Sequence, residues 1–194
     1  MMQLIQCFAI VQGKLDIIVR INYKQIKLKQ NMRQSNQDSR WYFDKVIHEK
    51  IKQGDEQEEQ GMYQEAIKFY SMAIQINPQD ADVCHNRGHN YVDLKNYSET
   101  IRDNYMAIQI NLGYAEAFYR RGAVYYKLKN YSQAIKVYSM AIQINPQYAE
   151  AFNNRGAAYN QLKNYSETIK DYSRAIQINP QYADAYNNRC VIYY

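Results

Sequence analysis

The sequence predicts an all-α protein, a solenoid of stacked antiparallel helix pairs. Glycine and proline are scarce among the 194 residues, with 7 and 3 copies, which disfavours a fold rich in β-turns. A block of 34 residues recurs along the chain, and residues 115–148 share 25 of 34 positions with residues 149–182 without a gap. Within each block, apolar and small residues recur at helical spacing. A repeat of this length is typical of helical arrays whose copies bury their apolar faces only by stacking.

The repeat divides the chain into six segments. The first 46 residues lie outside it, and the others are assigned as full copies at 47–80, 81–114, 115–148 and 149–182 and a half copy at 183–194. Within the first segment, two apolar runs around Gly13 are compatible with a β-hairpin, and the polar stretch 24–40 with a flexible linker. Residues 41–50 are expected to join the first helix of the array.

The third copy shows how the ends of the two helices are encoded. Lys129 and Asn130 are expected to end the first helix, because asparagine tolerates a left-handed conformation. Ser132 is the expected N-cap of the second helix, which is predicted over residues 133–144. Pro146 ends that helix, because proline restricts the residue before it and cannot extend the hydrogen-bond ladder.

Side-chain size along the copies predicts how the helices pack. Small residues are expected where two helices approach closely, at Gly88, Gly122 and Gly156 in the first helices. The chain has 21 tyrosines, and those that recur at packing positions of each helix pair are expected to fill the remaining space rather than to stack on nucleic-acid bases. In the second copy Leu112 stands where the other copies have proline, so Gly113 is expected to break the helix there.

This pattern resembles that of the tetratricopeptide-repeat family. The matching residues of the third copy are Phe118, Gly122, Tyr125, Ala134, Tyr138, Ala141 and Pro146. The resemblance extends from about residue 47 to the C-terminus. It implies a right-handed superhelix whose concave side is lined by the first helices. It also implies a protein or peptide partner that lies on that side as an extended segment or a short helix.

Side chains that point away from the packing stripe on successive first helices are candidate peptide-binding residues. We predict a groove formed by His85, Asn86, His89, Tyr119, Arg120, Asn153, Asn154, Asn187 and Asn188. Asn86, Asn154 and Asn188 share one repeat position, and an amide offers a peptide backbone both a donor and an acceptor. Their spacing resembles the asparagine ladder in the repeat region of protein O-glycosyltransferases. The alternative is that asparagine is simply tolerated there as polar surface.

The carboxylate clamp of cochaperones, which grips the acidic C-terminus of heat-shock chaperones, is not predicted. Only Asn86 and Arg120 match the residues that this clamp requires. Asp55 and Glu116 occupy neighbouring positions and would repel a terminal carboxylate.

Charge and cysteine usage exclude several other classes. The net charge of +5 arises entirely from residues 1–46, with 8 Lys/Arg against 3 Asp/Glu, since residues 47–194 hold 16 of each. Nucleic-acid binding by the repeats is therefore not expected. No run approaches the ~20 apolar residues of a membrane span, so no membrane insertion is expected. Cys7, Cys84 and Cys190 lack the spacing of a metal finger, and we expect a cytoplasmic chain with reduced thiols.

No pattern of residues indicates catalysis or a cofactor. His85 and His89 could face one side of a helix, but no second helix supplies an obvious third ligand, so no metal is expected. Glycines do not cluster into a phosphate-binding loop, and no nucleophile–base arrangement stands out. We therefore expect a non-enzymatic adaptor. Two alternatives remain open: a targeting or regulatory region of a larger glycosyltransferase- or phosphatase-like enzyme, and a structural module that self-associates through the half copy 183–194.

Overall fold

The computed structural model of the protein describes residue 27 and residues 40–192, and it divides into two compact units, Met1–Val46 and Ile47–Tyr194. Residues 40–46 of the first unit and residues 47–59 of the second unit are each helical, as expected for residues 41–50. The β-hairpin predicted near the N-terminus, and all but the two described positions of the predicted linker, lie outside the described residues. In the first unit, Trp41, Tyr42 and Phe43 are exposed on this helix.

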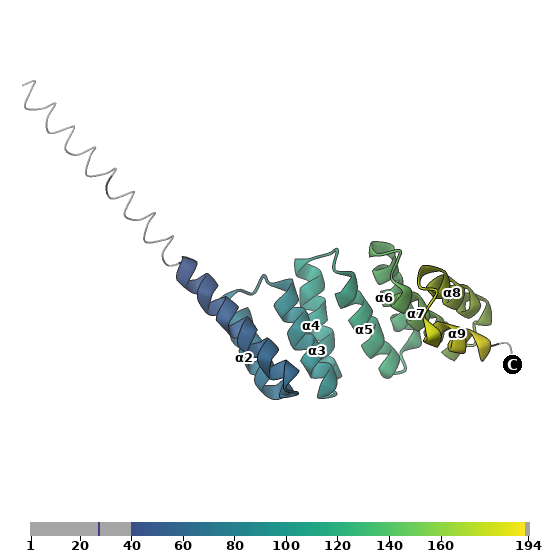
Figure 1. Ribbon diagram of the computed structural model, residues 1–194, viewed down its shortest axis with the longest axis horizontal. Helices are drawn as coiled ribbons and strands as arrows, with labels where there is room; N and C mark the ends of the chain where they lie inside the picture. Colours follow the sequence, from purple (N-terminus) through teal and green to yellow (C-terminus); the bar gives the residue numbers. More distant parts are fainter. Residues whose placement is uncertain (1–26, 28–39, 193–194) are drawn as a thin grey trace, which may run out of the picture. The chain divides into compact units, whose positions relative to one another are not determined.

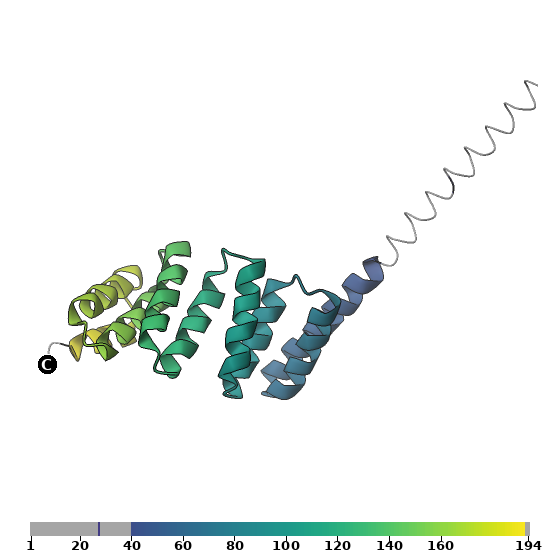
Figure 2. The same cartoon turned by 180° about the vertical axis from the view of Figure 1, so that it is seen from behind.

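The second unit is an all-α solenoid of antiparallel helix pairs, as predicted. After the helical residues 47–59 come α2 (Tyr63–Ile76), α3 (Ala81–Asp93), α4 (Tyr97–Ile110), α5 (Ala115–Lys127), α6 (Tyr131–Ile144), α7 (Ala149–Gln161), α8 (Tyr165–Ile178) and α9 (Ala183–Cys190). Consecutive helices lie side by side from both viewing directions (Figures 1 and 2). The first helices also contact each other, α3 with α5 and α5 with α7. None of the described helices is long and apolar enough to cross a membrane.

The turn inside each helix pair differs from the prediction. In the second, third and fourth copies the left-handed residue is a lysine, with φ 58° at Lys95, 59° at Lys129 and 58° at Lys163, and in the first copy it is Gly61, with φ 72°. Asn130 has φ −87° and is the N-cap of α6, where its Oδ1 accepts a hydrogen bond of 3.3 Å from the backbone N–H of Gln133. The predictions of a left-handed Asn130 and of a Ser132 cap are therefore wrong. Because the turn between α5 and α6 is short, Asn130, the residue directly before α6, serves as the N-cap. The left-handed position therefore falls one residue earlier, at Lys129.

This assignment predicts different effects for two neighbouring substitutions. Asn130→Ala is expected to lower the free energy of unfolding by about 0.5–2 kcal/mol, because the Gln133 amide loses its cap. Ser132→Ala, at an exposed position inside the first turn, is expected to stay within about 0.5 kcal/mol of the wild type. Urea denaturation followed by circular dichroism measures both. A larger loss for Ser132→Ala would restore the serine as the cap.

The second helices end in one way in every copy, whether or not a proline follows. Asn111 is extended, with φ −130° and ψ 96°, and Asn145 has φ −124° and ψ 92°. The Asn111 Oδ1 accepts a hydrogen bond of 3.0 Å from the N–H of Gly113, and Asn145 accepts one of 3.1 Å from Gln147. Gly113 is not among the positions with a positive φ, so the prediction that its flexibility breaks the helix is wrong. The asparagine side chain makes the break by itself.

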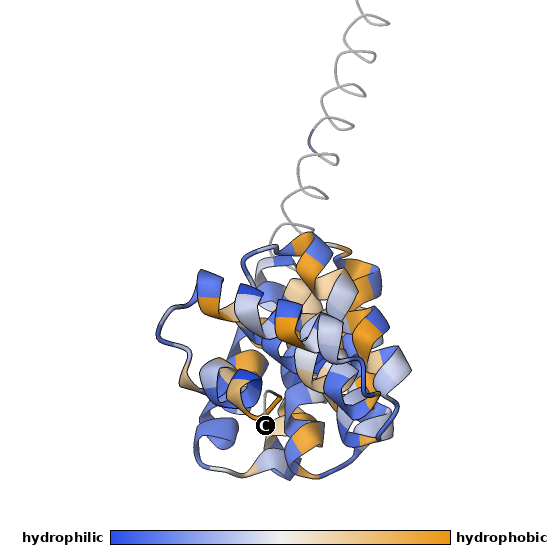
Figure 3. Cartoon of the chain, turned by 90° about the vertical axis from the view of Figure 1, so that its right-hand side faces the viewer, coloured by the Kyte–Doolittle hydropathy of each residue, from blue (hydrophilic) through white to orange (hydrophobic). Residues whose placement is uncertain are grey.

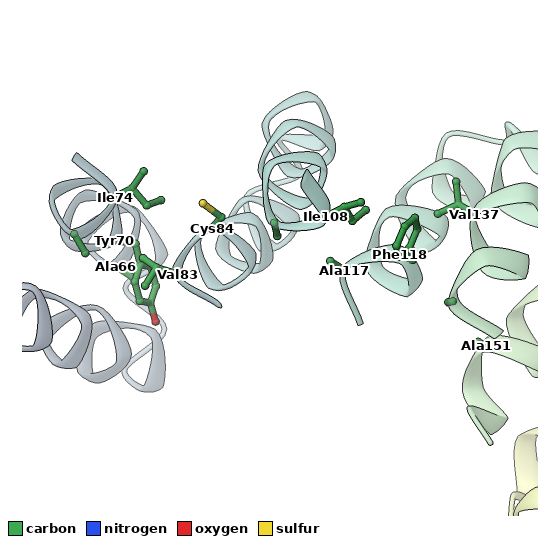
Figure 4. Close-up of a cluster of buried hydrophobic side chains, with 13 residues drawn as sticks. Ala66, Tyr70, Ile74, Val83, Cys84, Ile108, Ala117, Phe118, Val137 and Ala151 are labelled. Atoms are coloured by element: carbon green, nitrogen blue, oxygen red, sulfur yellow. The ribbon is translucent and has the colours of Figure 1, made fainter. Parts of the chain in front are cut away.

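Small side chains allow the helices to approach closely in the core. Ala107, Ala117 and Ala141 are fully buried between consecutive copies, and larger side chains such as Phe118 and Val137 fill the spaces beside them (Figure 4). The helices carry apolar residues together with hydrophilic ones (Figure 3). Stacking of one copy on the next therefore completes the core, as the repeat requires.

Arg87 and Arg155 each form a buried ion pair within their own copy and a hydrogen bond to the preceding copy, an arrangement that the sequence pattern did not predict. The guanidinium of Arg87 donates two hydrogen bonds of 2.7 Å to the carboxylate of Asp103 in its own copy. Its third nitrogen donates to Ser71 Oγ of the preceding copy at 3.0 Å. Asp103 is fully buried. The same arrangement recurs two copies further on among Arg155, Asp171 and Ser139.

Arg121, at the same repeat position, has no such pair. Val137 stands where the second and fourth copies have Asp103 and Asp171, and Tyr105 stands where the other full copies have serine. The Arg121 Nε is buried without a hydrogen-bond partner in the described part of the chain. Its guanidinium instead lies 5.6 Å from the ring centres of both Tyr105 and Tyr125, within the range of cation–π attraction.

Candidate functional site

A cavity of about 340 Å³ opens among the last three copies of the repeat. Residues of α5, α6, α7 and α9 line it: Ala123, Tyr126, Lys127, Tyr138, Asn153, Asn154, Ala157 and Asn188. Three of them, Asn153, Asn154 and Asn188, belong to the groove predicted from the sequence. Residues predicted on two different first helices, α7 and α9, thus come together around a shared space.

Two alanines keep this space open. Ala123 and Ala157 occupy the same position in consecutive first helices, and both line the cavity. At that position the two preceding copies carry Asp55, which lies 2.8 Å from the Tyr70 hydroxyl, and His89, which lies 3.0 Å from Glu58 Oε1. The small side chains of Ala123 and Ala157 leave room for the cavity that they line.

A chain of hydrogen bonds fixes the amides of the cavity wall. Asn188 Nδ2 donates to Asn153 Oδ1 at 3.1 Å, and Asn153 Nδ2 donates to Asn154 Oδ1 at 3.2 Å. Asn154 Nδ2 in turn donates to the hydroxyl of Tyr119 at 3.0 Å. Asn154 also interacts with the Tyr138 hydroxyl and Asn153 with the Tyr182 hydroxyl, whereas Asn188 has a second N–H and a carbonyl oxygen without a partner within the described residues. The wall therefore offers oriented donors and acceptors to a ligand.

Tyr119 and Arg120, both predicted groove residues, are held by contacts within the array. The Tyr119 ring lies 5.0 Å from the ring centre of Tyr148 and 5.9 Å from that of Tyr138. Arg120 Nε lies 2.7 Å from Glu116 Oε1, and Glu116 also accepts a hydrogen bond from the Tyr148 hydroxyl. Tyr119 thus supports the wall from behind, and Arg120 is already paired with a carboxylate.

The predicted residues on α3 do not take part in the cavity. His85 is 8 % exposed, and its Nδ1 lies 3.1 Å from Asn104 Oδ1. Burial lowers the pKa of His85, so its ring is neutral at neutral pH. His89 Nδ1 lies 3.0 Å from Glu58 Oε1. Among the described residues, no cluster of three histidine, cysteine or acidic side chains could hold a metal ion.

The remaining predicted positions, Asn86 and Asn187, also lie apart from the cavity. Asn86 is half-buried on α3, two copies away from Asn154, and Asn187 is exposed on α9 next to Asn188. The expected ladder of Asn86, Asn154 and Asn188 is therefore interrupted, since Arg120 stands between the first two. Only its C-terminal members share a space.

Five residues of the cavity were missing from the predicted groove. Ala123 and Ala157 are small, and Tyr138 was assigned to packing, which its 1 % exposure supports. Tyr126 and Lys127 lie one helical turn beyond Ala123, so the spacing of three to four residues along α5 was the signal that could have found them. Lys127 is exposed, with Nζ 6.0 Å from the ring centre of Tyr97, and it is the one charged residue of the lining.

Comparisons with protein-family models identify the repeat. A model described as "TPR repeat" matches residues 122–163, and two described as "Tetratricopeptide repeat" match residues 149–182 and 51–80. The chain is a tetratricopeptide-repeat protein. The family expected from the sequence is thereby confirmed. A search of curated protein sequences found no match.

Several solved structures share the fold. A "Crystal structure of MamA" has a TM-score of 0.68 and 24 % identity, and the match covers 72 % of this chain and 82 % of that chain. YrrB, titled "a TPR protein with an unusual peptide-binding site", has a TM-score of 0.65 and 23 % identity, over 78 % and 81 %. The "First TPR of Spaghetti (RPAP3) bound to HSP90 peptide SRMEEVD" has a TM-score of 0.58 and 27 % identity, over 59 % and 91 %.

Proposed function

We propose that this tetratricopeptide-repeat protein is a non-catalytic, cytoplasmic adaptor that binds a peptide segment of a partner protein at the cavity among its last three copies. The observation that carries the proposal is the amide chain of Asn188, Asn153 and Asn154, which lines an open space with oriented hydrogen-bonding groups. An extended peptide needs such groups, because its own backbone N–H and C=O groups lose water on binding.

Two structural relatives support the proposal that the ligand is a peptide. One is titled as bound to a peptide of HSP90 and another as having an unusual peptide-binding site. The lining itself consists of amides, tyrosines, alanines and one lysine, a composition suited to binding. The proposal does not extend to Asn86, His85, His89 and Asn187, which lie outside the cavity.

Selection from a random peptide display library on the immobilised full-length chain tests this function. We expect enriched peptides whose affinity, measured by fluorescence anisotropy, falls roughly three- to tenfold in Asn154→Ala and in Asn188→Ala. That range corresponds to about 0.5–1.5 kcal/mol per hydrogen bond.

Asn86→Ala is the matched control, because it removes the same residue from the same repeat position outside the cavity. Binding by this variant is expected to equal that of the wild type. The proposal fails when no peptide is enriched, or when Asn86→Ala weakens binding as much as Asn154→Ala does.

Self-association is a second candidate, favoured by exposed apolar side chains on and just after α9. Tyr186 is 43 % exposed and Val191 is 71 % exposed. Burial of such a surface would favour dimers at high concentration. Light scattering that gives a constant monomer mass across protein concentrations would remove this candidate.

A further inference from the structure

Tyr70 and Tyr138 occupy the same place in the first and third copies of the repeat. Each lies at the same position of a second helix, and each ring packs on a glycine of the preceding first helix. A Cβ atom added to Gly54 would lie 2.6 Å from Tyr70 Cε1, and one added to Gly122 would lie 2.7 Å from Tyr138 Cδ1. The two hydroxyl groups therefore face equivalent points of the array.

In the first copy, two carboxylates of the chain itself occupy the space in front of that hydroxyl. The Tyr70 hydroxyl lies 2.8 Å from Asp55 Oδ1 and 2.9 Å from Glu58 Oε2, at the edge of the buried cluster in Figure 4. Asn90 Nδ2 of the next copy donates to Glu58 Oε2 at 2.8 Å. Burial by itself raises the pKa of Glu58, but hydrogen bonds from Asn90, Tyr70 and His89 outweigh it and lower that pKa. The hydrogen bonds around Glu58 thus favour an ionised carboxylate, and the Glu58 side chain itself occupies this site.

In the third copy the carboxylates are missing but the hydroxyl remains. Ala123 and Tyr126 stand at the positions of Asp55 and Glu58, and the space in front of Tyr138 belongs to the cavity. Burial raises the pKa of Tyr138, so its hydroxyl keeps its proton and remains a donor at neutral pH. Lys127 gives the lining a positive charge, and no acidic residue lines the cavity to balance it.

From this internal comparison we infer that the cavity receives the side-chain carboxylate of an aspartate or glutamate in the bound peptide, in the place that Asp55 and Glu58 take in the first copy. The Tyr138 hydroxyl and the Asn188 amide are the proposed donors, and the Asn154 amide orients the Tyr138 hydroxyl. Lys127 supplies the countercharge on a flexible stem. The inference rests on the proposed peptide-binding function and assigns the class of residue that its ligand must carry.

The library selection tests this inference separately from the proposed peptide-binding function. If peptides are enriched but aspartate and glutamate are no more frequent in them than in the starting library, the adaptor function stands and the carboxylate inference fails. If acidic residues are enriched, a selected peptide and its Glu→Gln or Asp→Asn counterpart are compared. We expect the neutral peptide to bind about tenfold or more weakly, because the lost hydrogen bonds are charge-assisted. A C-terminally amidated peptide is expected to bind as tightly as the free acid, and loss of binding on amidation would overturn the side-chain assignment.

Matched variants of the two equivalent sites locate the carboxylate. Tyr138→Phe is expected to weaken the acidic peptide roughly three- to tenfold and to leave its neutral counterpart unchanged. Tyr70→Phe removes the same hydroxyl from the occupied site and is expected to leave peptide binding unchanged. The double variant Ala123→Asp, Tyr126→Glu places the carboxylates of the first copy in front of Tyr138, so it is expected to abolish binding of the acidic peptide. Retention of full affinity by this folded variant, checked by circular dichroism, would overturn the inference.

Discussion

Replacing Asp103 with alanine is expected to lower the free energy of unfolding by about 3–5 kcal/mol, the cost of leaving one partner of a buried ion pair uncompensated. Asp103 is fully buried, and both of its carboxylate oxygens accept hydrogen bonds of 2.7 Å from Arg87, whose side chain is 10 % exposed. In Asp103→Ala the guanidinium stays between the helices without its counter-ion. Urea denaturation of the full-length chain, followed by circular dichroism, measures the loss.

The double variant Asp103→Ala, Arg87→Met distinguishes the uncompensated charge from the loss of a stabilising pair. Methionine keeps an unbranched apolar stem, so the double variant is expected to recover most of the loss. Arg121→Met is the matched control from the copy without a carboxylate, and we expect it to change stability by less than about 1 kcal/mol. A double variant as unstable as Asp103→Ala would show that the ion pair itself stabilises the fold.

Gly122→Val is expected to destabilise the protein by about 1–3 kcal/mol through overpacking. A Cβ atom at position 122 would lie 2.7 Å from two carbons of the Tyr138 ring, closer than real side chains approach. The ring cannot move away easily, because it is 1 % exposed and packs beside Ala134 and Ala158. The same urea denaturation measures the change.

Gly113→Ala is the control for Gly122→Val, since its nearest neighbour would be the Asn111 Oδ1 at 3.4 Å in an exposed turn. It is expected to remain within about 0.5 kcal/mol of the wild type. Gly122→Val should also weaken peptide binding, because displacement of the Tyr138 ring changes the cavity that it lines. A stable Gly122→Val variant with an unchanged thermal midpoint would contradict the close packing of α5 on α6.

The sequence was sufficient to predict the fold, because the same helix-forming pattern recurs in each copy of the repeat. Each copy has the same apolar stripe and the same helix-ending asparagine, so all four full copies indicate a helix pair. The sequence-based prediction was wrong at the turn around Asn130, because either of two adjacent residues could be the N-cap or the left-handed residue. It also placed the break after α4 at Gly113, whereas the Asn111 side chain makes it. Both errors concern which of several neighbouring residues caps or ends a helix. Local propensity does not distinguish between such neighbours.

The candidate site was predictable only in part. Helical periodicity predicted Asn153, Asn154 and Asn188 on one surface, where they line the cavity, and it predicted His85 on that surface as well. His85 is nevertheless buried against Asn104 and Tyr114, because those side chains from the following helix and turn close over it. Periodicity identifies the side of a helix on which a residue lies, but it does not identify the residues of other helices that cover it.

By itself, the sequence therefore determined the family, the all-α architecture and the stripe that each helix buries, because these depend on a local period of 3.6 residues and a repeat of 34. The tertiary structure alone decided where a cavity opens and which charges are paired. The cavity depends on side-chain volume at Ala123 and Ala157 on two different helices, and the pairing of each arginine depends on the residue in the next helix that faces it. Such contacts join positions 16 to 35 residues apart in sequence, and their geometry follows from how the helices stack.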